Sequence, residues 1–139
     1  MKKISVFVSL ILLMSILFAC DSAITAEQLV GKWYLQSIDS EINGEKSSGP
    51  ILTSSDDVYY EFNPDSTYVL VELGEEEHGT WMLSADSLLG ISPVDYKDDS
   101  VNYLWMKIKS LDDSVMTISN TINTDYGIVD EISVYRRCR

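Results

Sequence analysis

Cysteine, histidine, proline and basic side chains are all scarce in this sequence. The 139 residues contain two cysteines, one histidine and three prolines, and only ten lysines and arginines stand against 22 aspartates and glutamates. A net charge of −12 argues against a nucleic-acid-binding protein, which needs clusters of basic side chains. No low-complexity linker interrupts the chain, so its length predicts a single domain.

A long hydrophobic run occurs only at the N-terminus. Lys2 and Lys3 precede an uncharged, mostly apolar stretch over 4–19, which is shorter than the ~20 residues that a membrane-spanning helix needs. A basic start, an apolar centre and a small residue at the end are typical of a secretory signal. We therefore predict that residues 1–19 are a signal peptide.

The end of this run, Leu17-Phe18-Ala19-Cys20, resembles the lipobox of bacterial lipoproteins. The resemblance implies that Cys20 becomes the first residue of the mature protein and carries fatty acyl chains such as palmitate. Residues 20–24 would then be a short tether, and the protein would lie in the cell envelope, with the outer membrane expected and its face left open. An ordinary signal with an incidental cysteine and a short anchor helix are the alternatives.

Removal of Lys2 and Lys3 with the signal leaves eight basic and 22 acidic residues, a net charge of −14. Anionic membrane surfaces repel such a protein, so we expect the lipid on Cys20, not the protein surface, to make the membrane contact. Cys138 is then the one free thiol. It either forms an intermolecular disulfide or stays free near the C-terminus, and we favour the second.

The mature chain opens with a short helix, predicted over 26–30. Thr25 and Gln28 have the spacing of a capping box, and Ile24 and Leu29 have the spacing of a hydrophobic staple. Gly31 follows directly and is a typical helix terminator.

Beyond this point apolar residues alternate with a period of two, which is typical of half-buried strands. The predicted strands are 32–39, 57–63, 67–73, 78–84, 87–92, 101–109, 114–119 and 130–137. Longer loops are expected over 41–56, 93–100 and 120–129. Many short strands joined by tight turns predict an all-β sandwich or barrel, in one domain over 25–139.

Gly31-Lys32-Trp33, directly after the short helix, resembles the G-x-W signature of the lipocalins. Later segments extend the resemblance to the lipocalin-like domain of bacterial cell-envelope lipoproteins: Tyr60-Glu61-Phe62-Asn63-Pro64-Asp65-Ser66, Gly79-Thr80-Trp81-Met82-Leu83 and Val134-Tyr135-Arg136-Arg137. The resemblance implies an eight-stranded antiparallel up-and-down barrel that is closed near the helix. It also implies a binding module, not an enzyme.

In that family the G-x-W tryptophan packs under an arginine of the last strand. Trp33 matches the tryptophan. Arg136 shares strand parity with Ile132 and Val134, which we expect to face the core. We therefore predict that Trp33 and Arg136 close the floor of the barrel.

The same alternation predicts which side chains point into the barrel. An eight-stranded barrel either is filled by its side chains or holds one small ligand, so this set either forms the core or lines a pocket for a small apolar molecule: Tyr60, Phe62, Trp81, Leu83, Leu104, Met106 and Met116. Tyr103 and Trp105 have the opposite parity. They either bind a protein partner or lie beneath the 41–56 loop.

The sequence offers no catalytic or metal-binding set. His78 lies next to Glu75, Glu76 and Glu77 in a hairpin without a nucleophile motif, and is expected to be a solvated loop residue. This cluster and a second one (Asp95, Asp98 and Asp99) lack the spacing of a calcium loop. One histidine and one free thiol are too few for zinc. We therefore expect no cofactor. The protein is expected to be either a binding protein or a structural subunit of an envelope assembly.

Overall fold

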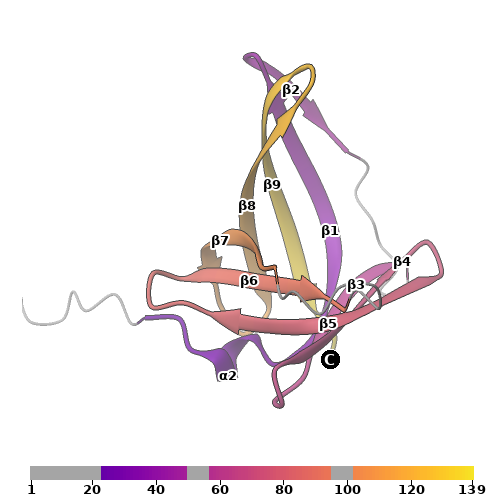
Figure 1. The fold of residues 1–139 in the computed structure, drawn as a ribbon, viewed down its shortest axis with the longest axis vertical. Coiled ribbons are helices and arrows are strands. Elements are labelled where there is room, and N and C mark those ends of the chain that lie inside the picture. Colours follow the sequence, from indigo (N-terminus) through magenta and orange to yellow (C-terminus); the bar gives the residue numbers. More distant parts are fainter. Residues whose placement is uncertain (1–22, 50–56, 95–101) are drawn as a thin grey trace, which may run out of the picture.

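The computed structural model describes residues 23–49, 57–94 and 102–139 (Figure 1). This part of the chain contains one short helix, α2 (Ala26–Leu29), and nine strands: β1 (Gly31–Ile42), β2 (Glu45–Ser48), β3 (Val58–Phe62), β4 (Thr67–Glu72), β5 (Glu75–Leu83), β6 (Leu88–Pro93), β7 (Leu104–Leu111), β8 (Val115–Thr124) and β9 (Gly127–Arg137). Each strand pairs antiparallel with the next around the sheet, and β1 also pairs with β9. The predicted eight-stranded antiparallel barrel is confirmed, with β2 as an additional strand beside β1.

Two of the expected loops contain long strands instead. β1 continues to Ile42 and turns through Asn43 and Gly44, both at positive φ, into β2. β8 runs to Thr124 and β9 begins at Gly127, so most of 120–129 is strand as well. Their polar sequences lack an alternating apolar pattern, so the sequence alone does not predict these strand extensions. Together they project beyond the other strands (Figure 1).

The hydrophobic core fills the barrel towards the end where α2 lies. Leu29 and Trp33 are fully buried there. Thr25 donates its backbone N–H to Oε1 of Gln28 at 2.9 Å, as the predicted capping box requires. Within the described ranges, no helix has the length and apolar character needed to cross a membrane.

An irregularity in β1 changes which of its side chains point inward, whereas β9 alternates without interruption. The pairing with β9 shifts between Leu35 and Ser37, where β1 carries one extra residue. Leu35 faces the inward-pointing Tyr135, and beyond the bulge Ile38 faces the buried Ser133. Inward residues of β9 are therefore odd-numbered, and Ile132 is 43% exposed on the outside.

Candidate functional site

Trp33 and an arginine seal one end of the barrel, and the arginine is Arg137. Its Cζ lies 4.2 Å from the centroid of the Trp33 ring. Its Nη1 donates to the carbonyl of Val30 at 2.7 Å, and its Nη2 donates to the carbonyl of Gln28. The indole Nε1 of Trp33 donates to the carbonyl of Leu29 at 2.8 Å. The carbonyls at the end of α2, which the helix itself cannot pair, are thus satisfied by the barrel floor.

The predicted pairing of Trp33 with Arg136 is wrong. Arg136 is exposed and donates from Nε to the side chain of Gln36 at 2.8 Å, on the outer surface. The register places Trp33 opposite Arg137, because β9 turns its odd-numbered residues inward. Gly31 is part of the same arrangement: its φ is +130°, and a Cβ there would lie 2.7 Å from Nη1 of Arg137.

Most of the predicted inward set lies in the core. Tyr60, Phe62, Trp81 and Met116 are buried, and Leu83 and Met106 are partly buried against them. Leu104 is the exception and corrects the prediction, since it is 53% exposed. The pairing of β7 with β8 ends at Lys107 and Ser119, so Leu104 has a neighbouring strand on one side only.

Trp105 lies on the outside of the barrel, as its parity predicts. It is 41% exposed, and its ring covers Gly90 of β6 so closely that a Cβ at that position would lie 2.9 Å from it. The rings of Tyr103 and Trp105 are 5.6 Å apart. The two therefore form a small aromatic patch on the outer wall.

Three tyrosines mark the upper boundary of the core. The Tyr60 ring lies 6.0 Å from that of Tyr68 and 5.8 Å from that of Tyr135, and it stacks on Phe62 at 5.4 Å. The Tyr68 hydroxyl donates to Oε1 of Glu77 at 2.7 Å. Burial raises the pKa of Tyr60 to about 12, with further contributions from nearby carboxylates. Burial likewise raises the pKa of Tyr68 and of Tyr135.

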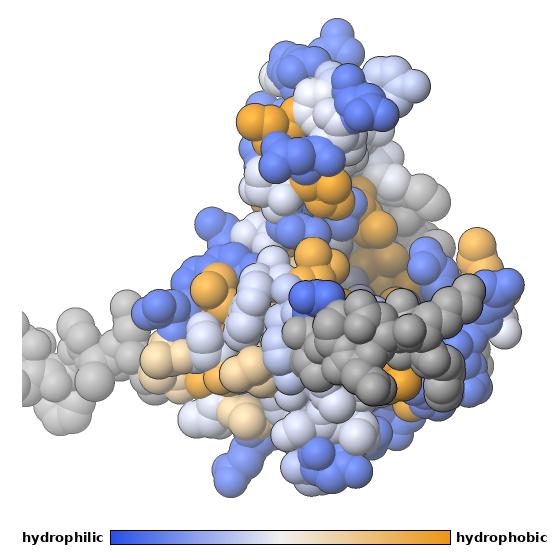
Figure 2. Space-filling view, viewed as in Figure 1, coloured by the Kyte–Doolittle hydropathy of each residue, from blue (hydrophilic) through white to orange (hydrophobic). Residues whose placement is uncertain are grey.

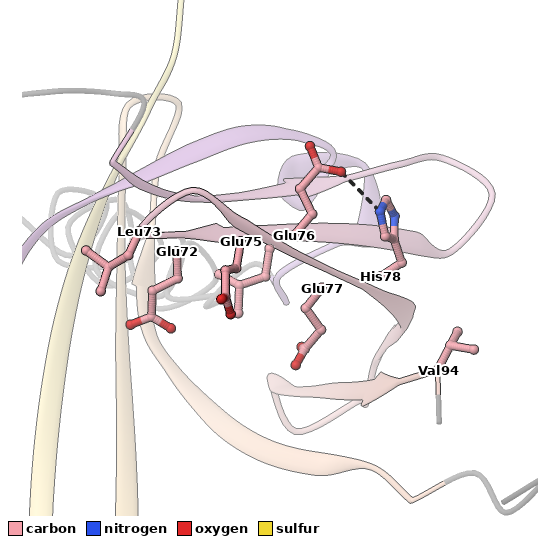
Figure 3. Close-up of a pocket in the computed structure, with 8 residues that line it drawn as sticks. Glu72, Leu73, Glu75, Glu76, Glu77, His78 and Val94 are labelled. Carbon is pink, nitrogen blue, oxygen red and sulfur yellow. Dashed lines mark ion pairs between the residues drawn. The ribbon is translucent and has the colours of Figure 1, made fainter. Parts of the chain in front are cut away.

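An acidic cavity lies around the β4–β5 hairpin, at the end of the barrel away from α2. Its volume is about 730 Å³ (Figure 3). Its walls come mainly from the β4–β5 hairpin: Leu70, Glu72, Leu73, Glu75, Glu76, Glu77, His78 and Val94. Glu72, Glu75 and Glu77 point to one side of this hairpin, whereas Glu76 turns the other way, 3.3 Å from His78 (Figure 3).

The sequence analysis missed this cavity because it assigned the glutamates to a solvated loop. The sequence nevertheless contained an indication of it, because Glu75 and Glu77 share strand parity with the buried Trp81. Among the described residues, no three His, Cys, Asp or Glu side chains gather closely enough to hold a metal ion. Asp95, Asp98 and Asp99 lie outside these residues, as do Cys20 and the rest of 1–22. Cys138 is a half-buried free thiol.

One family model matches the chain. It describes a lipocalin-like domain and covers residues 29–118, from the end of α2 into β8. No curated protein matches the chain in sequence. The match includes Trp33 and the glutamates of the open end, and it agrees with the closed antiparallel barrel. The chain belongs to the family of lipocalin-like domains.

Proposed function

We propose that the protein is a lipid-anchored component of the bacterial cell envelope that binds a small, partly apolar molecule at the open end of its barrel. The observation that carries this proposal is the difference between the two ends. Trp33 and Arg137 seal one end, and a cavity of about 730 Å³ opens at the other. Such a volume falls in the range of small-molecule pockets, ~300–1,000 Å³.

Binding, not catalysis, is the activity this arrangement supports. Lipocalin-like domains are in general binding and carrier folds. His78 of the cavity contacts Glu76, and both side chains are exposed, so the pair lacks the buried, oriented geometry of a catalytic base. The function is therefore to take up, carry or sense a ligand.

Native mass spectrometry of residues 21–139, produced in the host, tests the binding function. We expect an additional small mass that stays with the folded protein and is lost on unfolding. A clean apo mass together with a co-purifying protein would instead support a structural subunit. That alternative is favoured by one observation, the exposed pair of Tyr103 and Trp105. A Trp105→Ala variant should then lose the protein partner.

Lipidation of Cys20 would orient the barrel relative to the membrane. The chain enters the barrel at Ile24 and α2, beside the closed end. Three residues lie between Cys20 and Ile24, so four chain steps of at most ~3.6 Å each keep the two within ~14 Å of one another. The lipid would therefore hold the closed end towards the membrane, and the cavity would face away from it.

The Cys20→Ser variant tests the anchor. We expect either an unprocessed precursor or a soluble, unlipidated protein, assayed by detergent partition and the mass of the N-terminal peptide. A variant of mature size that still partitions into detergent would contradict lipidation at Cys20.

A further inference from the structure

Two lysines lie beside the point where the N-terminal chain enters the barrel. We infer that the closed end docks directly on the membrane, with Lys107 and Lys109 binding phosphate groups of lipids next to the anchor. This inference rests on the lipid anchor at Cys20, which is part of the proposed function. It adds a protein contact to the lipid contact and specifies which face of the barrel lies on the bilayer.

A cavity of about 620 Å³ lies at the closed end, beside the N-terminal chain. Its walls come from three separate segments of the chain: Ala23 and Ile24, the β5–β6 turn over 85–87, and 107–110 of β7. Figure 1 shows the N-terminal chain beside that turn, and Figure 2 shows weakly hydrophobic surface there. Ala23 is three chain steps from Cys20, at most ~11 Å. Acyl chains on Cys20 would therefore hold this cavity close to the lipid headgroups.

The two lysines of this cavity are exposed and can bind an anion. Lys107 donates from Nζ to the backbone carbonyl of Asp86. Lys109 forms no hydrogen bond or ion pair among the described residues. Asp86 provides the one carboxylate among the residues that line the cavity. Because an ammonium group has three N–H donors, both lysines retain donors that a lipid phosphate would accept.

The charge of the mature chain is divided unevenly between the two ends of the barrel. At the closed end, basic and acidic residues are equal in number within the described ranges. The basic ones are Lys32, Lys107, Lys109, Arg136, Arg137 and Arg139. The acidic ones are Glu27, Glu61, Asp65, Asp86, Asp112 and Asp113. Within the same ranges Lys46 is the only basic residue at the open end, where β1, β2, β4, β5 and β9 all carry carboxylates.

This division removes from the closed end the repulsion that the net charge alone predicts. Asp130 and Glu131 lie on β9, about 20 Å along the strand from Arg137 at ~3.3 Å per residue. The Debye length at physiological ionic strength is ~8 Å, so solvent ions screen these carboxylates from a membrane at the closed end. Lys107 and Lys109 would then attract anionic lipids, while the acidic open end stays in solution.

Acetylation of lysines by a water-soluble N-hydroxysuccinimide ester measures this contact. The lipidated protein is purified from its host, placed in vesicles of phosphatidylcholine and phosphatidylglycerol, and the modified lysines are identified by mass spectrometry. We expect Lys107 and Lys109 to react at least fivefold more slowly than in a non-ionic detergent, because a lysine at an anionic surface gains ~1 kcal/mol, about fivefold in affinity. Lys46 should react equally in both, and high salt should remove the protection.

A double variant, Lys107→Gln with Lys109→Gln, tests the two lysines directly. A dye attached through Ser110→Cys in a Cys138→Ser background is quenched when nitroxide-labelled lipid headgroups are near. We expect strong quenching on the anionic vesicles, and a fall in the double variant to the level seen on pure phosphatidylcholine. Lys46→Gln is the matched control, because it removes a lysine charge at the open end, and it should retain the quenching. Circular dichroism verifies that these exposed substitutions leave the fold intact.

The outcomes separate docking from the anchor itself. Equal slowing of all three lysines, or of none, on anionic vesicles would overturn the docking and leave the anchor in place. An N-terminal peptide without acyl chains would overturn both, because the barrel would have no tether. Protection of Lys107 and Lys109 that persists in detergent without lipid would place a protein surface over the cavity, and would likewise overturn the inference.

Discussion

Replacing Arg137 by alanine should destabilise the barrel far more than the same change at Arg136. Arg137 loses three hydrogen bonds to the carbonyls of Gln28, Val30 and Asp113, each worth ~0.5–1.5 kcal/mol. It also loses the contact with the Trp33 ring, worth ~0.5–2 kcal/mol. Partial exposure reduces the sum, so we expect a loss of about 3 kcal/mol for Arg137→Ala. Arg136→Ala loses one exposed hydrogen bond and should cost less than about 1 kcal/mol.

A double-mutant cycle isolates the contact between the two side chains. Trp33→Ala should cost ~3–5 kcal/mol, as a buried aromatic residue does. The double variant of Trp33→Ala and Arg137→Ala should show a coupling energy of about 1 kcal/mol. The double variant of Trp33→Ala and Arg136→Ala should show no coupling energy. Urea unfolding of residues 21–139, followed by far-UV circular dichroism, gives these values. Equal losses at the two arginines, or a coupling of zero with Arg137, would refute this account of the closed end.

Two further predictions concern the tyrosine layer and the glycine beneath Arg137. Because the pKa of Tyr60 is raised from 10.0 to about 12 in the fold, its neutral form contributes stability that is complete below pH 10. That contribution, roughly 3 kcal/mol, is lost as the pH rises to 12. Urea unfolding at pH 9–12 should show that the free energy of unfolding falls less steeply with pH in Tyr60→Phe than in the unaltered protein. The same slope in both proteins would contradict this. Gly31→Ala should cost at least about 1 kcal/mol more than Gly44→Ala: both positions have positive φ, but only Gly31 meets Arg137. Equal costs would count against the close approach.

The closed barrel could be predicted because its strands alternate clearly. Tyr60 and Phe62 of β3, and Trp81 of β5, repeat every second residue and are all buried. The parity of the last strand could not be obtained in the same way. Ile132 and Val134 are apolar, yet they point outward, because β9 alternates without interruption from Arg137, which lies opposite the inward-facing Trp33. Apolar side chains on the outer face of a strand cannot be told from core residues by their alternation alone.

The open end was harder to predict for a different reason. Its walls are built mainly from charged strand residues, Glu72 and Glu75–Glu77, which have the composition of a surface loop. Only the pairing of these segments with buried strands shows that alternate residues face inward. Their place in a cavity depends on contacts between distant parts of the chain, which the alternation within one segment does not reveal.

Methyl NMR of residues 21–139 tests the central claim, that a small molecule binds at the open end. Spectra are recorded on the protein as purified from its host, and again after bound compounds have been extracted. We expect the methyl signals of Leu70, Leu73 and Val94, which line the cavity, to shift, and those of Leu29 and Met116 in the core to stay in place. Identical spectra, or shifts confined to the closed end, would contradict the account.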